Sequence, residues 1–141
     1  MSANIQPDAV EQSVRPRVLV IEDEFLIVTA ATEFLTELGY DVVAAFGTLR
    51  QALDVIADVD CDAAVLDVVL HKEDSFPAAE ALIRRGIPLG FATAWDKLAL
   101  SEKWHDFPYI SKPYNREDLR SLMRQILQDK AAPEQSADPV V

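Results

Sequence analysis

Continuous apolar runs alternate along this chain with segments whose apolar residues recur at helical spacing. The first run, RVLVIED at 17–23, is apolar until acids close it, and the segment that follows stops at Gly39. The apolar residues of that segment recur at the spacing of a helix face, at Ile27, Ala31, Phe34, Leu35 and Leu38. Because strands that are apolar on both faces are typical of parallel sheets covered by helices, the chain is predicted to be an α/β protein.

The same alternation continues through the rest of the chain. Further strands are predicted at 40–46, 62–67, 87–93 and 107–113. Helices are predicted after a cap at Thr48, after Pro77 and after a cap at Asn115, the last one burying Leu119, Leu122, Met123, Ile126 and Leu127. The segment 96–106 is the weakest helix prediction because its apolar residues are sparse. Five strands joined by right-handed crossovers are expected to form a doubly wound parallel sheet.

The size and charge of the chain limit its organisation and its partners. With 141 residues, 50% of them hydrophobic, it is expected to form one domain at 16–128 between polar tails at 1–15 and 129–141. A formal net charge of −11 argues against nucleic acid and anionic membrane as partners, which leaves proteins and cations. The lone Cys61 permits no internal disulfide, and no stretch resembles a signal peptide or a membrane span, so a cytoplasmic protein is predicted.

Chemically active side chains follow the predicted strands at the point where each strand ends. Glu22 and Asp23 close the first strand, Asp67 the third, Thr93 the fourth and Lys112 the fifth. Because a parallel sheet brings the carboxyl ends of its strands to one edge, we expect these side chains to form a single site. Carboxylates gathered at such an edge repel one another, so the site is expected to need a cation.

The residue types at this edge indicate the chemistry. A set of oxygen ligands without histidine favours Mg²⁺, or Mn²⁺, over zinc. A metal, a carboxylate, a lysine and a hydroxyl together are the parts of a phosphoryl-transfer site. Asp67 is the expected nucleophile because it stands alone at the end of a central apolar strand. Ala94, next to Thr93, is small enough for its backbone N–H to approach a phosphoryl oxygen.

Taken together, these positions resemble the receiver domain of bacterial two-component response regulators, over about residues 16–128. The matching residues are, in order, Glu22-Asp23, Asp67, Thr93-Ala94, Tyr109 and Lys112-Pro113. The resemblance implies a flavodoxin-like (CheY-like) sheet with the strand order 2-1-3-4-5. It also implies that a sensor histidine kinase, or a small phosphodonor, phosphorylates Asp67 in a reaction that depends on Mg²⁺.

The resemblance further implies a role for each matched position. The implied metal ligands are Asp23, Asp67, the backbone carbonyl of Val69 and, through water, Glu22. The phosphoryl group is implied to be bound by Lys112 and by the backbone N–H groups of Val68 and Ala94. The implied switch residues are Thr93 and Tyr109, and the Lys112-Pro113 peptide is implied to be cis.

The string DVVLHKEDSFPAAEALIRRGIPLGFATAW, at 67–95, lacks the Met-Pro and the following glycine that are common after the acceptor aspartate in receivers. It is similar to the single-domain subfamily known for a Phe-Ala-Thr-Gly motif, which acts downstream of HWE-type kinases in bacterial stress signalling. Ala94 replaces the usual glycine and Val69 the usual polar residue, so the lifetime of the phosphoryl group is left open. Trp95 either shields the phosphoryl group from water or covers core that the weak segment 96–106 exposes.

The sequence therefore predicts a stand-alone regulator that signals by phosphorylation-dependent contact with an unidentified downstream protein. A phosphate sink and a relay intermediate would have the same site. A small phosphatase with an aspartyl nucleophile is an alternative, although such an enzyme normally needs a second acid where this chain has Val69. A receiver fold that binds partners without phosphorylation is another. We expect no enzyme activity beyond phosphorylation and dephosphorylation of Asp67, and we expect the segment 96–106 to order on phosphorylation.

Overall fold

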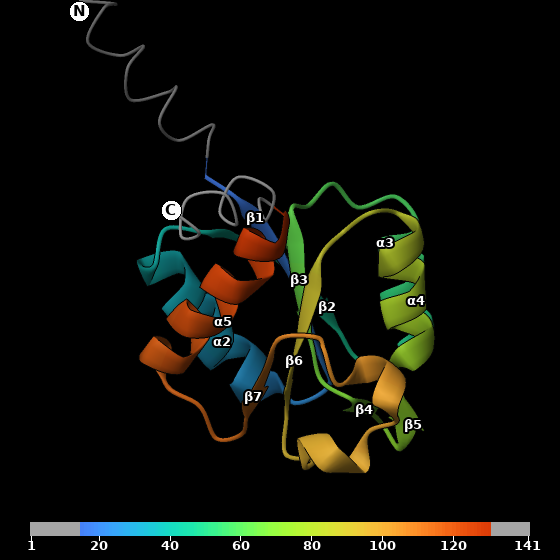
Figure 1. The fold of residues 1–141 in the computed structure, drawn as a ribbon. Helices are drawn as coiled ribbons and strands as arrows, with labels where there is room; N and C mark the ends of the chain where they lie inside the picture. The colour runs from blue at the N-terminus through green and yellow to red at the C-terminus, as the bar shows by residue number, and fades with distance from the viewer. Residues whose placement is uncertain (1–14, 131–141) are drawn as a thin grey trace, which may run out of the picture.

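Parallel strands in the order β2-β1-β3-β6-β7 form the central sheet of the computed structural model, which describes residues 15–130 (Figure 1). The strands are β1 Arg17–Glu22, β2 Asp41–Phe46, β3 Ala63–Leu66, β6 Leu89–Thr93 and β7 Tyr109–Ser111. Counted within this sheet alone, the order is 2-1-3-4-5, so the predicted doubly wound topology is confirmed. β1 is buried after its first residue and β3 throughout, as their apolar runs require.

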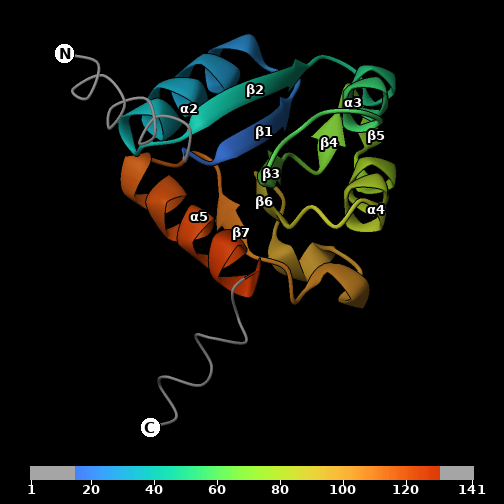
Figure 2. The same cartoon turned by 90° about the horizontal axis from the view of Figure 1, so that it is seen from above.

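Helices cover both faces of the sheet (Figure 2). The two pairs are α2 Phe25–Glu37 with α5 Arg116–Lys130, and α3 Leu49–Ile56 with α4 Phe76–Arg84. Successive residues of a strand point to opposite faces, so Val18 and Val20 pack with α2 and α5, whereas Leu19 and Ile21 pack with α3 and α4. Because both faces are covered, groups that must meet a partner or a ligand are confined to the ends and edges of the sheet.

Local signals in the sequence explain where several of these helices begin or end. Thr48 and Gln51 form a capping box at the start of α3, in which each side chain accepts a hydrogen bond from the other residue's backbone N–H. Asn115 and Asp118 exchange the same pair of bonds at the start of α5. Gly39, with φ of 103°, follows α2 in a conformation that other residues rarely adopt. The predicted caps and the predicted stop are therefore confirmed.

The buried stripe of α2 differs in part from the predicted one. Ala31 and Leu35 are buried as expected, but the third buried residue is Val28, which the sequence pattern did not indicate. Ile27 and Phe34 are only half-buried, because both line a groove next to the carboxyl edge of the sheet. One side of α2 therefore faces the core and the adjoining side faces this groove.

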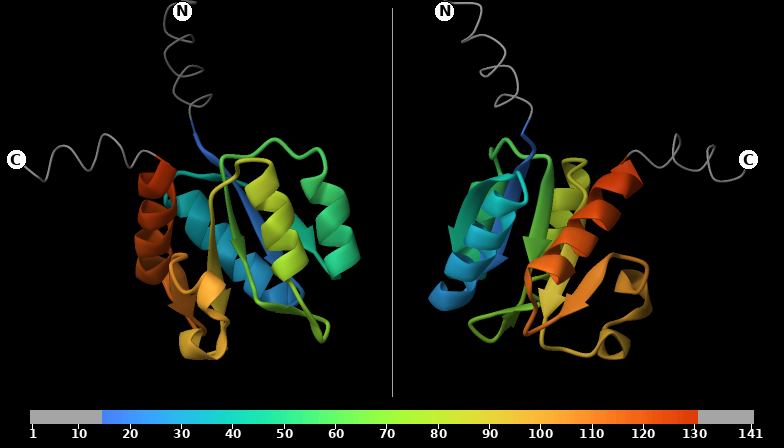
Figure 3. Two further views of the ribbon diagram at one scale, coloured as in Figure 1. Left: turned by 45° about the vertical axis from the view of Figure 1, so that its right-hand side comes forward. Right: turned by 90° about the vertical axis from the view of Figure 1, so that its left-hand side faces the viewer.

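The connection between β6 and β7 contains no α-helix, only two short 3₁₀ turns, η1 Lys97–Ala99 and η2 Glu102–Trp104 (Figure 3). The prediction of a weak or irregular fourth helix is thus confirmed. Trp104, which is 4% exposed, stacks on Phe76 with ring centroids 4.9 Å apart and meets Phe91 edge-on at 5.8 Å. One large aromatic side chain therefore covers the core where a helical stripe would otherwise do so.

A small hairpin follows β3, and the sequence did not predict it. Its strands, β4 Val69–Leu70 and β5 Glu73–Asp74, pair antiparallel. The residues at its tip, His71 and Lys72, have φ of 48° and 73°. Tight turns with positive φ usually carry asparagine, aspartate or glycine, so a His-Lys pair has no turn signature.

The predicted tails, 1–15 and 129–141, lie outside the described residues except for positions 15, 129 and 130. Nε of Arg15 lies 3.0 Å from the Asp41 carboxylate, and Nη2 donates to the carbonyl of Tyr40 at 3.2 Å. Between residues 15 and 130, no helix combines the length and the apolar character needed to cross a membrane.

Candidate functional site

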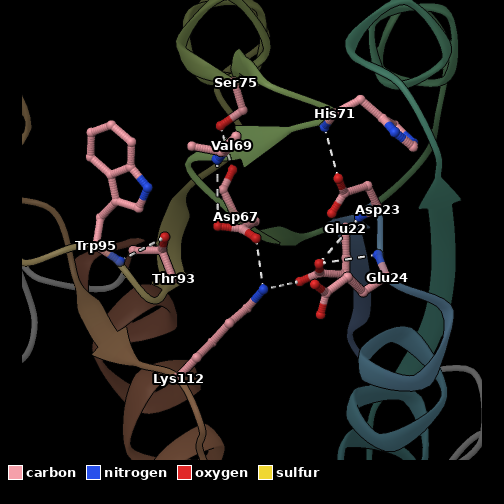
Figure 4. A network of polar contacts seen from close by, with 10 residues as sticks. All are labelled: Glu22, Asp23, Glu24, Asp67, Val69, His71, Ser75, Thr93, Trp95 and Lys112. Carbon is pink, nitrogen blue, oxygen red and sulfur yellow. Dashed lines mark hydrogen bonds and ion pairs between the residues drawn. The ribbon is translucent and has the colours of Figure 1, made fainter.

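Side chains from four strands meet at one edge of the sheet (Figure 4). Glu22 is the last residue of β1, Asp67 directly follows β3, Thr93 ends β6 and Lys112 follows β7. Glu22, Asp67 and Thr93 are 3%, 8% and 0% exposed, respectively. The parallel sheet thus brings together the acids, the hydroxyl and the lysine that the sequence indicated, at the edge where such folds place their ligand sites.

Lys112 connects two of the acids. Its Nζ lies 2.6 Å from Oδ2 of Asp67 and 2.9 Å from Oε1 of Glu22. Burial lowers the pKa of Lys112, but the hydrogen bonds to Asp67 and Glu22 outweigh this effect, and the net pKa is raised. The lysine therefore keeps its positive charge between two carboxylates.

Burial disfavours the ionised form of Glu22. Burial raises the pKa of Glu22 to about 7, because the hydrogen bond from Lys112 offsets only part of the cost of desolvation, and the charge of Asp67 adds to it. Its Oε2 accepts from the backbone N–H groups of Asp23 and Glu24, at 3.2 Å each. A cation bound next to Glu22 would favour the ionised carboxylate.

The acids fit a divalent cation. Glu22, Asp23 and Asp67 each place a carboxylate oxygen within 4.8 Å of the others, and Lys112 brings one positive charge against these three groups. Val69 lines the same cavity, and its N–H donates to Oδ1 of Asp67 at 3.4 Å. A donor set made only of oxygen suits Mg²⁺ or Mn²⁺ better than zinc.

Two residues that sequence reasoning missed, His71 and Ser75, contact this edge of the sheet from the side of the hairpin. The backbone N–H of His71 donates to Oδ2 of Asp23 at 2.7 Å. The hydroxyl of Ser75 donates to the backbone carbonyl of Asp67, and its N–H donates to the carbonyl of Val68 at 2.7 Å. A backbone donor cannot be recognised from a sequence, because every residue except proline has one. A serine just before Phe-Pro is typical of an ordinary helix N-cap.

Thr93 and Tyr109 are connected through the backbone of Trp95. The N–H of Trp95 donates to Oγ1 of Thr93 at 3.2 Å, and the hydroxyl of Tyr109 donates to the carbonyl of Trp95. Ala94 is exposed between them and lines the cavity next to the acids. The Lys112-Pro113 peptide is cis, as the resemblance implied.

Exposure separates the two interpretations of Trp95. Its side chain is 49% exposed and lines the cavity that also contains Asp67 (Figure 4). The core near the irregular connection is covered instead by Trp104. The interpretation of Trp95 as a cover for the core is therefore wrong, and its action as a shield stays a prediction.

A groove with a volume of about 620 Å³ extends from the acids along α2, and we call it the α2 groove. Its polar end is lined by Asp23, Asp67, Thr93 and Lys112. The remainder is mostly apolar and is lined by Leu26, Ile27, Ala30, Phe34, Pro113 and Tyr114. Burial raises the pKa of Tyr114 to about 12, so this phenol is neutral at physiological pH. The groove thus joins a cluster of charged side chains to an apolar surface.

Comparisons with known proteins agree with this architecture. Residues 18–124 match the family model of the response regulator receiver domain. The transcriptional regulatory protein PdtaR of Mycobacterium tuberculosis is 31% identical over 113 residues, which cover 77% of this chain and 55% of PdtaR. The chain therefore spans about half the length of the curated relatives it matches.

Two solved structures with the same fold come from proteins with similar sequences. SdrG from Sphingomonas melonis is 33% identical with a TM-score of 0.71, and the match covers 80% of this chain and 97% of that one. PhyR from Brucella abortus is 26% identical with a TM-score of 0.73, and the match covers 94% of this chain and 56% of PhyR. On the family match, the sheet order and the similarity to these regulators, this chain belongs to the response regulator receiver domain family.

Proposed function

We propose that this chain is a two-component response regulator that accepts a phosphoryl group on Asp67 from a sensor histidine kinase, with Mg²⁺ or Mn²⁺ as cofactor. The observation that carries the proposal is the environment of the Asp67 carboxylate. It lies 2.6 Å from Nζ of Lys112, and its oxygen lies within 4.8 Å of oxygens of two further acids. Membership of the receiver family supports the same acceptor.

In the proposed transfer, a carboxylate oxygen of Asp67 attacks the phosphorus of a phosphohistidine. The phosphorus–nitrogen bond breaks, and its electron pair leaves with the imidazole. Lys112 then shares its ammonium group with a phosphoryl oxygen, and the backbone N–H groups of Val68 and Ala94 donate to the other oxygens. These donors stabilise the negative charge that builds up beside the acceptor.

The cation has a separate part in this proposal. A divalent ion at this edge would neutralise the charge of the incoming phosphoryl group next to the carboxylates. The residues proposed to hold it are Asp23, Asp67, the carbonyl of Val69 and, through water, Glu22. The hydrogen bond from His71 to Asp23, at 2.7 Å, leaves the other oxygen of that carboxylate available for such a ligand.

The α2 groove is the proposed docking surface for the kinase. A phosphohistidine must come within bonding distance of Asp67, so the protein that carries it must cover the surface around the acids. That surface is apolar along α2, where Leu26 is 80% exposed and Ile27 and Phe34 line the groove. Exposed apolar surface next to a reaction centre is typical of a protein interaction site. The proposal of an HWE-type kinase rests on the resemblance of the 67–95 string.

Thr93 and Tyr109 are the proposed switch. The Thr93 hydroxyl accepts from the N–H of Trp95, so its own hydrogen is free to be donated to a phosphoryl oxygen. Movement of Thr93 would reach Tyr109 through the carbonyl of Trp95. A structure described as the BeF3-activated conformation of SdrG, 35% identical, supports the proposal that this chain too has an activated conformation. We propose that the segment 96–106 orders in response and contacts the downstream protein.

Incubation with acetyl phosphate and Mg²⁺ tests the acceptor. Mass spectrometry should detect one added phosphoryl group on the wild-type chain and on Asp106→Asn, a control at an exposed aspartate. Asp67→Asn should stay unlabelled, and EDTA should abolish labelling of the wild type. Labelling of Asp67→Asn at the wild-type rate would refute the assignment.

The fate of the phosphoryl group separates the roles that share this site. Gain of a protein partner on phosphorylation supports an output regulator, whereas rapid return of the group to a histidine supports a phosphate sink or a relay intermediate. The phosphatase alternative is disfavoured because the side chain of Val69 cannot donate a proton at the position where such enzymes carry an acid. Sustained turnover of a simple phosphate ester would revive it.

A further inference from the structure

Ser75 is fully buried next to the proposed acceptor, and the function above assigns it no role. It is 0% exposed, and its hydroxyl donates to the backbone carbonyl of Asp67. Its N–H donates to the carbonyl of Val68 at 2.7 Å. Both bonds therefore end on the two peptide units that begin at the acceptor.

The hydroxyl of Ser75 does not serve the helix that follows it. Ser75 is the residue before α4, where a serine side chain ordinarily accepts a bond from the first turn, but here it makes no such bond. Pro77 has no N–H, and the N–H of Ala78 donates to the backbone carbonyl of Ser75 at 2.9 Å. The N–H of Phe76 donates to Oδ1 of Asp74 at 3.1 Å. The first turn of α4 therefore does not need the Ser75 hydroxyl, whose hydrogen bond goes eight residues back, to the carbonyl of Asp67.

Ser75 also closes the loop that contains the hairpin. The chain leaves Asp67, turns at His71 and returns to Asp67 at Ser75, so the bonds of Ser75 fix the base of the loop. The tip of the same loop donates to Asp23 through the N–H of His71 at 2.7 Å. One closed loop therefore contacts two of the acids, and Val69, whose carbonyl is a proposed metal ligand, lies within it (Figure 4).

We propose that Ser75 is a positioning residue of the phosphorylation site. Its hydroxyl fixes the peptide units after Asp67, so that the N–H of Val68 points to the phosphoryl group and the carbonyl of Val69 points to the divalent cation. The inference rests on the proposed function, because it assigns Ser75 to that same site. Loss of the hydroxyl frees this backbone, and groups that orient metal ligands typically change metal affinity or activity by about 10–100-fold.

Calorimetric titration with Mg²⁺, the initial rate of labelling by acetyl phosphate and the melting temperature together test the proposal. Ser75→Ala should bind Mg²⁺ about tenfold more weakly and be labelled more slowly, whereas Ser75→Thr, which keeps the hydroxyl, should recover both. Ile56→Val is the control for stability alone, because it removes one methylene from a fully buried side chain of α3. It should lower the melting temperature and leave Mg²⁺ affinity and labelling at wild-type values.

The outcomes separate the inference from the function on which it rests. Equal Mg²⁺ affinity and labelling rate in Ser75→Ala and Ile56→Val would overturn the positioning role. If Ser75→Ala does not fold, Ser75→Cys decides in the same way, since a thiol is close to a hydroxyl in size but is a weak donor. A wild-type chain that binds Mg²⁺ but is never labelled would overturn the proposed function, and the Mg²⁺ affinities alone would then decide the role of Ser75.

Discussion

Replacing Lys112 with methionine keeps most of the apolar stem of the side chain and removes its charge. Nζ of Lys112 lies 2.6 Å from Asp67 and 2.9 Å from Glu22, and the side chain is 13% exposed. Removing one partner of a buried ion pair costs about 3–5 kcal/mol, because the other charge is left unpaired. In metal-free buffer we expect Lys112→Met to lower the free energy of unfolding by about 3 kcal/mol. The measurement belongs above pH 7, since the pKa of Glu22 is about 7.

The same substitution is expected to strengthen the binding of Mg²⁺. Asp67 and Glu22, the two acids that contact Nζ, are proposed to hold the ion directly and through water, respectively. With metal–oxygen distances of about 2.1 Å, the ion would lie within about 7 Å of the ammonium group. At that separation the repulsion is about 1 kcal/mol in a water-like medium and about 5 kcal/mol at an effective dielectric constant of 20. The lower part of this range already predicts about tenfold tighter binding. Labelling by acetyl phosphate should nevertheless become slower, because a donor to the phosphoryl oxygens is gone.

Calorimetric titration measures the Mg²⁺ affinity, and urea denaturation in EDTA measures the stability. Lys103→Met is the matched control, since it removes the same charge from a half-exposed lysine that pairs with Glu80 rather than with the acids of the site. Tighter Mg²⁺ binding by Lys112→Met alone would support shared use of the acids by lysine and metal. Affinity equal to or weaker than that of Lys103→Met would refute this reasoning.

Substitutions at the two tryptophans, at Gly90 and at Tyr114 test the packing of the core, the close approach of a helix to the sheet and the dependence of stability on pH. Trp104→Ala removes a buried side chain and should lower the free energy of unfolding, measured in urea, by about 3 kcal/mol. Trp95→Ala, at a half-exposed position, should change that free energy by less than about 0.5 kcal/mol and should shorten the half-life of the phosphoryl group. Gly90→Ala should cost about 1–3 kcal/mol in thermal unfolding, because the new Cβ would lie 2.8 Å from Cδ1 of Ile126. Burial raises the pKa of Tyr114 to about 12, against 10.0 for a free tyrosine, so the folded state favours the neutral phenol. The free energy of unfolding should therefore fall as the pH rises from about 10 to 12. Tyr114→Phe should remove this part of the decline.

The parts of the molecule that could be predicted from the sequence are those set by regular periodicity. Continuous apolar runs indicated buried parallel strands, and parallel strands place their carboxyl ends at one edge, so the meeting of Glu22, Asp67, Thr93 and Lys112 followed from their positions alone. The caps at Thr48 and Asn115 were likewise readable, because each depends on residues three positions apart.

The parts that could not be predicted depend on contacts between distant segments. The hairpin at 69–74 has only two residues in each strand, and its tip is held by Asp23, which is 48 positions away from His71 in the sequence. The covering of the core by Trp104 depends on Phe76 and Phe91, which belong to other elements. Trp95 directly precedes the weak segment 96–106 and Trp104 lies within it, and the sequence pattern there could not decide which of the two is buried.

Strand ends and loops contribute different chemical groups to the site, and this difference affects which substitutions the site tolerates. The strand ends contribute charged side chains and the Thr93 hydroxyl, on which the proposed chemistry depends. The loops contribute mainly backbone groups: the N–H of His71 to Asp23, the N–H of Val69 to Asp67 and the peptide of Trp95 between Thr93 and Tyr109. Backbone groups are present whatever the side chain, so the chain can carry valine at 69 and alanine at 94 without removing a contact. Ser75 is the exception, because it is a loop residue whose side chain makes the bond, and for that reason it is the loop position where substitution should be felt most.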